Sequence, residues 1–297
     1  MKLQAIVTIP PYADYLDEIA AHPIVSGFRL NTVMPLKESK EEALRRLGAL
    51  GQPLWVDLKA RQLRVVNAAI PPYTEVQLSH PISVDTPVDA FFSDGTERAK
   101  VVGINGNRLI LADGPRRLIG PGESVNIVHP SLEIKGNLTE TDKEYLQAMK
   151  NVNLNKVMLS YVEHPEDIKE VKALLPGAEV ILKIESQKGL KLSRAQGAKQ
   201  GNLMAARGDL FVEVKQPHLV VNALKEIIQS DPKAIVASRI FDSLAYFPVP
   251  ASADIGDVAF LMEIGYRVFM LGDAICFERD SVMEALNLLQ AMAEDYQ

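Results

Sequence analysis

A lysine and two acidic residues in the middle of the chain have the spacing of a metal and oxyanion site. Lys183 and Glu185 lie two residues apart in an apolar run, so both side chains point to the same face of a predicted strand. Asp209 ends the next apolar run, one strand–helix unit later. Two carboxylates, with water and substrate oxygens, satisfy the coordination of Mg²⁺ or Mn²⁺. We therefore predict this cation on Glu185 and Asp209, and predict that Lys183 stabilises a transferring phosphoryl group or an enolate.

Other apolar runs also end in polar residues. Arg29 and Asn31 end one run, Asp57 and Lys59 end another, and Ser238 ends a third. In a parallel barrel the catalytic groups come from the carboxyl ends of the strands, so we expect these side chains at one mouth.

The segment before Asp209 completes the predicted substrate site. Arg207 is expected to contact substrate, and Gly208 leaves room for close backbone approach, so N–H groups near Asp209 could hold a substrate carboxylate. Purely structural roles remain open for these residues. The two charges of a Lys-x-Glu pair can simply neutralise each other, and Ser238 can be a helix cap or a hydroxyl in the core. The apolar neighbours of Lys183 and Glu185 favour function, because an unpaired charge on an apolar strand is costly.

The elements that must position these residues alternate regularly along the chain. Short apolar runs alternate with amphipathic stretches of helical length, which predicts a (β/α)₈ TIM barrel, an α/β fold. The predicted strands are Gln4–Ile9, Gly27–Val33, Leu54–Leu58, Lys156–Tyr161, Glu179–Glu185, Asn202–Asp209, Ala234–Ser238 and Arg267–Leu271. The predicted helices are Asp14–Ala21, Glu38–Leu50, Thr139–Lys150, Pro165–Leu175, Gly189–Gln196, Pro217–Gln229, Ile255–Ile264 and Ser281–Ala293.

One connection does not fit the alternation. Residues 66–132 lack a helical period, and the dipeptides Asp94-Gly95 and Asn105-Gly106 suit tight hairpin turns. We therefore predict a small β-barrel-like domain inserted after the third strand, with the (β/α)₈ barrel formed by residues 1–65 and 133–297. Such a domain, standing over the carboxyl ends of the strands, would act as a lid.

Composition excludes several classes of protein. The chain has 297 residues and a net charge of −6, without the basic excess that nucleic-acid binding needs. A lone Cys276 cannot form an internal disulfide, and the N-terminal apolar run is too short for a leader or a membrane span. We expect a cytoplasmic protein without a nucleic-acid or membrane partner. Because the sequence has no glycine-rich phosphate loop of the Walker or dinucleotide type, any nucleotide must be bound by other groups.

Several segments, in this order along the chain, resemble the pyruvate kinase family. They are Arg29-Leu30-Asn31, Asp57-Leu58-Lys59 through Arg64, Ser93-Asp94-Gly95, Lys183-Ile184-Glu185-Ser186, Ala206-Arg207-Gly208-Asp209-Leu210 and Pro250–Leu271. The resemblance extends over nearly the whole chain and includes the insertion after the third strand. It implies a phosphotransferase that acts on phosphoenolpyruvate or pyruvate with Mg²⁺ and ADP or ATP, as in glycolysis.

The resemblance also implies roles for individual residues. It places Mg²⁺ on Glu185 and Asp209, Lys183 at the phosphoryl or enolate centre, Arg29 near the phosphate, and Ser238 where the family has a threonine. It further places Asn31, Lys59 and Arg64 on the nucleotide side and Asp94 in the lid.

Departures from the family pattern refine these expectations. Two positions of the family's potassium site match, Asn31 and Asp57, whereas Val33 and Leu58 differ, which argues against potassium dependence. Phe211 replaces a glycine beside Asp209, and Gly272-Asp273-Ala274 departs from a Ser-Gly-Glu segment. The family continues into a C-terminal regulatory domain, whereas this chain stops after its eighth predicted helix, so we do not expect sugar-phosphate control.

Two other functions stay open. The same metal and enolate chemistry serves lyases and aldolases that make or break a carbon–carbon bond in a 2-oxo or hydroxy acid, and a non-catalytic relative would only bind a small acid or a protein. The predicted lid and Lys183 favour the kinase, while the altered potassium site favours the lyase. Because related barrels often form dimers, we expect a homo-oligomer.

Overall fold

Eight parallel strands close into a barrel. The structure is a computed structural model that describes residues 2–67, 75–214 and 216–295. Neighbouring strands follow the order β1-β15-β14-β13-β12-β11-β3-β2, so the first and last strands pair and close the ring. The barrel strands are β1 (Gln4–Thr8), β2 (Val25–Asn31), β3 (Leu54–Leu58), β11 (Lys156–Leu159), β12 (Glu179–Ile184), β13 (Asn202–Ala206), β14 (Ile235–Ala237) and β15 (Val268–Leu271). The predicted (β/α)₈ barrel is confirmed.

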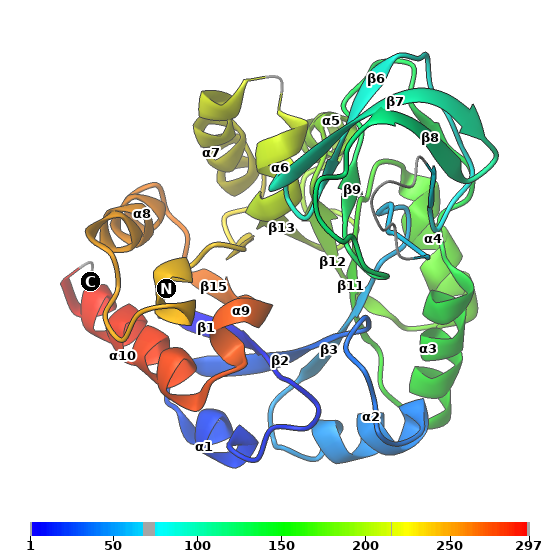
Figure 1. The fold of residues 1–297 in the computed structure, drawn as a ribbon. Coiled ribbons are helices and arrows are strands. Elements are labelled where there is room, and N and C mark those ends of the chain that lie inside the picture. Colours follow the sequence, from blue (N-terminus) through cyan, green and yellow to red (C-terminus); the bar gives the residue numbers. More distant parts are fainter. Residues whose placement is uncertain (1, 68–74, 215, 296–297) are drawn as a thin grey trace.

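Helices surround the barrel (Figure 1). They are α1 (Leu16–Ala21), α2 (Lys40–Gly48), α3 (Glu140–Asn151), α4 (Pro165–Leu174), α5 (Gln187–Gln196), α6 (Arg207–Glu213), α7 (Val220–Ser230), α8 (Ser252–Glu263), α9 (Asp273–Cys276) and α10 (Arg279–Asp295), with the 3₁₀ turns η1 (Pro217–Leu219) and η2 (Asp242–Ala245). An ion pair between Glu18 and Arg279 joins the first and last of these helices. No helix within the described ranges is long and apolar enough to cross a membrane.

Several predicted element boundaries were wrong by a few residues, as two examples show. The strand predicted to run to Asp209 ends at Ala206, because Arg207 begins the short helix α6. The last helix begins at Arg279, two residues before the predicted Ser281. In contrast, Thr139 is the N-cap of α3 and Pro165 is the first residue of α4, as the cap residues predicted.

An apolar layer fills the barrel below its mouth. Ile6, Met158 and Ile181 belong to this buried cluster. Because side chains on a strand repeat their direction every second residue, Thr8, Ser160 and Lys183 stand one step nearer the carboxyl ends. The polar floor of the mouth therefore rests directly on packed aliphatic side chains.

A lobe of antiparallel strands interrupts the barrel between β3 and α3. It contains a five-stranded sheet and a two-stranded sheet, and it lies next to α6 (Figure 1). Its strands are β4 (Glu75–Gln77), β5 (Ile82–Ser83), β6 (Val88–Phe92), β7 (Glu97–Asn105), β8 (Arg108–Asp113), β9 (Val125–Asn126) and β10 (Glu133–Ile134). Asp94-Gly95 lies in the turn of the hairpin β6–β7 and Asn105-Gly106 in the turn of the hairpin β7–β8, as predicted. The inserted β domain is thus confirmed.

The lobe has its own apolar core. Phe92, Val101 and Leu109 are buried in this cluster, apart from the barrel core. Leu63 also belongs to it, and β10 pairs with β5. The predicted limits of the domain, residues 66 and 132, stay a prediction. Residues 68–74, near the first limit, lie outside the described residues.

One buried carboxylate ties the start of α3 to the end of β3. Asp142 accepts hydrogen bonds from the backbone N–H groups of Lys59 and Ala60, at 2.9 and 3.0 Å. It also completes a capping box with Thr139. The chain therefore re-enters the barrel beside the point where it left, and Lys59 is fixed at the mouth.

We expect Asp142→Ala to lower the free energy of unfolding by about 2–4 kcal/mol, because two buried N–H groups and the α3 cap lose their acceptor. Urea unfolding followed by circular dichroism measures this. The control Glu140→Ala removes an exposed carboxylate of the same helix turn and should change stability by less than about 0.5 kcal/mol. Equal losses in both variants would contradict the proposed tie.

Candidate active site

A cavity of about 660 Å³ opens at the carboxyl ends of the barrel strands, between the barrel and the lobe. Ten residues singled out from the sequence line it: Arg29, Asn31, Lys59, Arg64, Asp94, Lys183, Glu185, Gly208, Asp209 and Ser238. They come from most of the strand ends and from the lobe. The structure thus brings the candidate residues of distant segments to one place.

Asp57 is the charge centre beneath this cavity. Its side chain is fully buried, and it accepts hydrogen bonds from Arg29 Nε at 2.9 Å, Lys59 Nζ at 2.8 Å and Lys183 Nζ at 3.2 Å. Burial opposes ionisation, but the charges of Lys183, Lys59 and Arg29 outweigh it and hold the pKa of Asp57 well below its usual value. Asp57 is therefore a carboxylate that gathers three cations.

The two lysines differ in their surroundings. Lys183 donates to Ser160 Oγ at 2.7 Å and lies 3.2 Å from Glu185 Oε1. Although burial works against its charge, Asp57 and Glu185 raise the pKa of Lys183. For Lys59, burial dominates and lowers the pKa to about 7 against the attraction of Asp57. Of the two lysines, Lys183 is thus the one whose surroundings favour the charged form.

Glu185 and Asp209 share one partner, Tyr161. The Tyr161 N–H donates to Glu185 Oε2 at 2.7 Å, and its hydroxyl lies 3.3 Å from Asp209 Oδ1. Burial and the charge of Asp209 raise the pKa of Glu185 to about 7, although Lys183 opposes this. The two carboxylates therefore meet at the mouth, as their positions on neighbouring strands predicted.

Three polar residues that were not predicted for the site, Gln62, Asn126 and Tyr161, contact Asp209. Gln62 Nε2 donates to Asp209 Oδ2 at 2.6 Å, and Asn126 Nδ2 donates to Oδ1 at 3.0 Å. Asn126 also lies 3.2 Å from Glu213, whose pKa is raised to about 8 by burial and the charge of Asp209. Tyr161 ends a predicted strand and Gln62 lies within the family-like segment Asp57–Arg64, so both positions carried a usable signal, whereas Asn126 follows no motif.

The lobe meets the barrel at Asp94 and Gly208. A Cβ atom on Gly208 would lie 2.9 Å from Asp94 Oδ2 and 3.5 Å from Ser238 Oγ. Glycine therefore leaves the space that the Asp94 carboxylate occupies. Burial and the charge of Asp209 raise the pKa of Asp94. A hydrogen bond from Ser124 and the charges of Arg239 and Arg64 oppose this rise but do not cancel it.

Arg207 does not reach the cavity, contrary to its predicted contact with substrate. Its Nη1 lies 2.7 Å from both carboxylate oxygens of Asp257, and its other nitrogens donate to the carbonyl oxygens of Ser238 and Arg239. The guanidinium is committed to these partners because Arg207 begins α6 instead of continuing the strand. It supports the loop after β14.

The two residues predicted for a monovalent cation, Asn31 and Asp57, are engaged by other side chains of the protein. The three cations around Asp57 leave no unbalanced negative charge there. The Asn31 amide donates to both oxygens of Asp273, at 3.1 and 3.0 Å, and Arg29 also contacts Asp273 at 3.1 Å. The expectation that the chain does not depend on potassium stays a prediction.

The carboxylates suit a hard divalent cation that takes most of its ligands from water and substrate oxygens. Among the described residues, no three His, Cys, Asp or Glu side chains gather as a ready metal cage. Mg²⁺ usually takes only one or two protein carboxylates. Glu185 and Asp209, two buried acids that repel each other at a cavity wall, provide that number.

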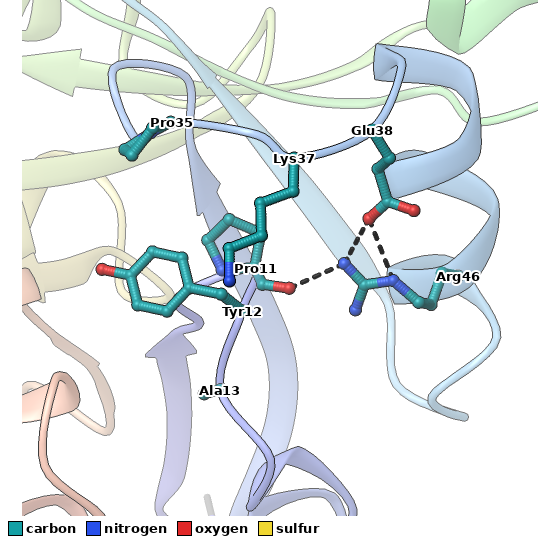
Figure 2. Close-up of a pocket in the computed structure, with 7 residues that line it drawn as sticks. All are labelled: Pro11, Tyr12, Ala13, Pro35, Lys37, Glu38 and Arg46. Atoms are coloured by element: carbon teal, nitrogen blue, oxygen red, sulfur yellow. Dashed lines mark hydrogen bonds and ion pairs between the residues drawn. The ribbon is translucent and has the colours of Figure 1, made fainter.

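A second pocket of about 350 Å³ lies at the rim, between the loops that follow β1 and β2 (Figure 2). Its lining residues are Pro11, Tyr12, Ala13, Pro35, Lys37, Glu38 and Arg46. The Arg46 guanidinium is already bound by Glu38 and by the Pro11 carbonyl oxygen. The pocket shares no lining residue with the main cavity.

A barrel mouth with a buried Lys-x-Glu pair, an aspartate from the short helix after the next strand and a lobe inserted after β3 defines a class of (β/α)₈ barrel proteins. The family model described as "Pyruvate kinase, barrel domain" matches residues 82–274, well over half of the chain. The chain therefore belongs to the pyruvate kinase family.

Curated relatives agree with this assignment. A pyruvate kinase from Borreliella burgdorferi is 23% identical over 300 residues, which cover 91% of this chain and 62% of the relative. One from Methanocaldococcus jannaschii is 25% identical over 313 residues, covering 99% of this chain and 69% of the relative. Pyruvate kinase 2 from Synechocystis is 31% identical over 183 residues, covering 59% and 31%. This chain spans less than two thirds of the length of the first relative.

We expect Asp57→Asn to lower the free energy of unfolding by roughly 3–5 kcal/mol, because the substitution leaves three buried cations without their shared anion. Thermal and urea unfolding at constant pH measure the change. Asp17→Asn, on the exposed face of α1, makes the same charge change and should have little effect. A loss below 1 kcal/mol for Asp57→Asn would contradict its place as the charge centre.

Proposed function

We propose that this chain transfers a phosphoryl group between phosphoenolpyruvate and ADP. One observation carries the proposal: Lys183, Glu185 and Asp209 line one cavity with Arg64 and Asp94, which face it from the lobe side. The arrangement combines a permanent cation, a pair of carboxylates and further guanidinium groups. These are the groups that phosphoryl transfer needs, since its catalysis is mostly positioning and charge stabilisation.

Lys183 is proposed to act on the moving group. Its ammonium is held by Ser160, Asp57 and Glu185, so its position changes little when substrate binds. As the bond between phosphorus and the enol oxygen breaks and the bond to the ADP oxygen forms, negative charge on the transferring group faces this cation. The enolate that remains takes up a proton at its methylene carbon and becomes pyruvate.

Glu185 and Asp209 are proposed to hold Mg²⁺, for which Mn²⁺ can substitute. The bound ion would supply positive charge to the oxygens of the substrate acid and the phosphoryl group. The chain's own contribution is to orient the two carboxylates: Tyr161 fixes Glu185, while Gln62 and Asn126 fix Asp209. Ser238 offers a hydroxyl to the same cavity, which Arg29, Asn31 and Lys59 also line.

The deciding experiment incubates the protein and Mg²⁺ with phosphoenolpyruvate and a panel of nucleoside diphosphates. Parallel samples contain oxaloacetate or related 2-oxo and hydroxy acids, and ¹H and ³¹P NMR identify the products. Nucleoside triphosphate and pyruvate are expected. Pyruvate or an aldehyde released from a larger acid would instead select the carbon–carbon lyase, and an inert panel would select the non-catalytic relative.

We expect Lys183→Met to lower kcat by at least about 10²–10³-fold with folding retained, because the buried cation that faces the developing charge is lost. Initial rates of pyruvate formation and circular dichroism measure the two effects. Lys225→Met, on the exposed side of α7, is the matched control and should keep the rate. Equal rates for both variants would contradict the role of Lys183.

Metal affinity is expected to fall about tenfold from pH 8 to pH 6. Burial and Asp209 raise the pKa of Glu185 to about 7, so the carboxylate that binds metal is largely protonated at the lower pH. Mn²⁺ titration followed by electron paramagnetic resonance measures this without turnover. Glu185→Gln should abolish binding, whereas Glu179→Gln, at the exposed start of β12, should preserve both affinity and its pH dependence. Chelation of the metal should stop pyruvate formation.

A further inference from the structure

An arginine that the sequence analysis assigned no role stands at the wall of the main cavity. The Arg239 guanidinium carbon lies 4.8 Å from the centre of the Phe211 ring, in a cation–π arrangement. Its Nη2 lies 3.4 Å from the backbone oxygen of Asp94 on the lobe. Phe211 lies on α6, so this short helix supplies the aromatic ring on which Arg239 stacks.

The backbone that carries Arg239 is held in an unusual conformation. Ser238 and Arg239 have φ angles of +71° and +57°, which non-glycine residues adopt rarely. Arg207 holds this turn, because it donates to the carbonyl oxygens of Ser238 at 3.0 and 2.8 Å and of Arg239 at 3.0 Å. Asp257 in turn fixes Arg207 from α8. Strained residues that the surroundings hold in place concentrate at binding and catalytic sites.

Arg239 forms no close ion pair among the described residues, although its charge acts on the nearby Asp94 carboxylate. Within residues 2–67, 75–214 and 216–295, no carboxylate oxygen lies within 4.0 Å of its nitrogens, whereas Arg29, Lys59 and Lys183 in the same cavity all contact Asp57. Arg239 is exposed, so its planar fork of donors is accessible from the cavity. Such a fork matches the oxygens of a phosphate or a carboxylate.

We propose that Arg239, oriented by Phe211 and by the Arg207–Asp257 pair, binds an oxyanion of the ligand and sets its specificity. The inference deepens the proposed function, because it takes the main cavity as the substrate site. The oxyanion belongs either to the phosphates of the phosphoryl acceptor or to the carboxylate of the small acid. Both present oxygens at the spacing that a guanidinium recognises.

Isothermal titration calorimetry of the full chain, with Mg²⁺ present and no turnover, tests the proposal. The probes are pyrophosphate for the phosphate source and oxalate for the carboxylate source. We expect Arg239→Gln to weaken binding of one probe by about tenfold or more, which identifies the source. Arg239→Lys should weaken binding of the same probe nearly as much, because lysine keeps the positive charge but lacks the planar fork of donors and the stacking on Phe211. Phe211→Leu should weaken the same probe by a smaller factor.

Arg116→Gln is the matched control, since it removes an exposed arginine of the lobe that is not part of the cavity. It should leave both affinities unchanged. Unchanged affinity of Arg239→Gln for both probes, with binding to the parent chain intact, would overturn the inference. So would full rescue by Arg239→Lys, which would reduce the effect to charge alone. A chain that binds a probe through Arg239 but makes no pyruvate would refute the proposed phosphoryl transfer and leave this inference standing.

Discussion

The arrangement of the mouth depends on the burial of one carboxylate, Asp57. Three cations contact it from different strand ends, and each would be costly to bury without it. Its charge therefore lets Arg29, Lys59 and Lys183 approach one another beneath a single cavity. Their total charge exceeds that of Asp57, and Glu185 and Asp273, which contact Lys183 and Arg29, balance the difference.

Burial of these charges is possible because they stand on a rigid support. The side chains that fill the barrel below them are apolar and buried. Close packing fixes the strands, and backbone hydrogen bonds fix the register, for example Lys183 opposite Met204. The positions of the charged groups then follow from the strand geometry, so the site needs little rearrangement to present its cations.

Much of this arrangement could be predicted from the sequence, because it follows from periodicity. Alternating apolar runs predict the barrel, and the two-residue spacing of Lys183 and Glu185 predicts their common face. The insertion followed from the loss of helical period and from two hairpin dipeptides. Contacts between distant segments could not be predicted in this way. No local pattern places Gln62 or Asn126 on Asp209, and the helical start at Arg207, which turns that side chain towards Asp257, depends on tertiary packing.

The two donors to Asp209 have a thermodynamic consequence for the lobe. Asn126 lies on β9 of the lobe, and Gln62 lies on the segment that leads into it. If the lobe tilted away, a buried carboxylate would lose the groups that solvate it. The orientation of the lobe and the hydrogen bonding of Asp209 are therefore linked. By reciprocity, any ligand that favours the hydrogen-bonded position of Asp209 also favours the present orientation of the lobe, even if it touches only the barrel.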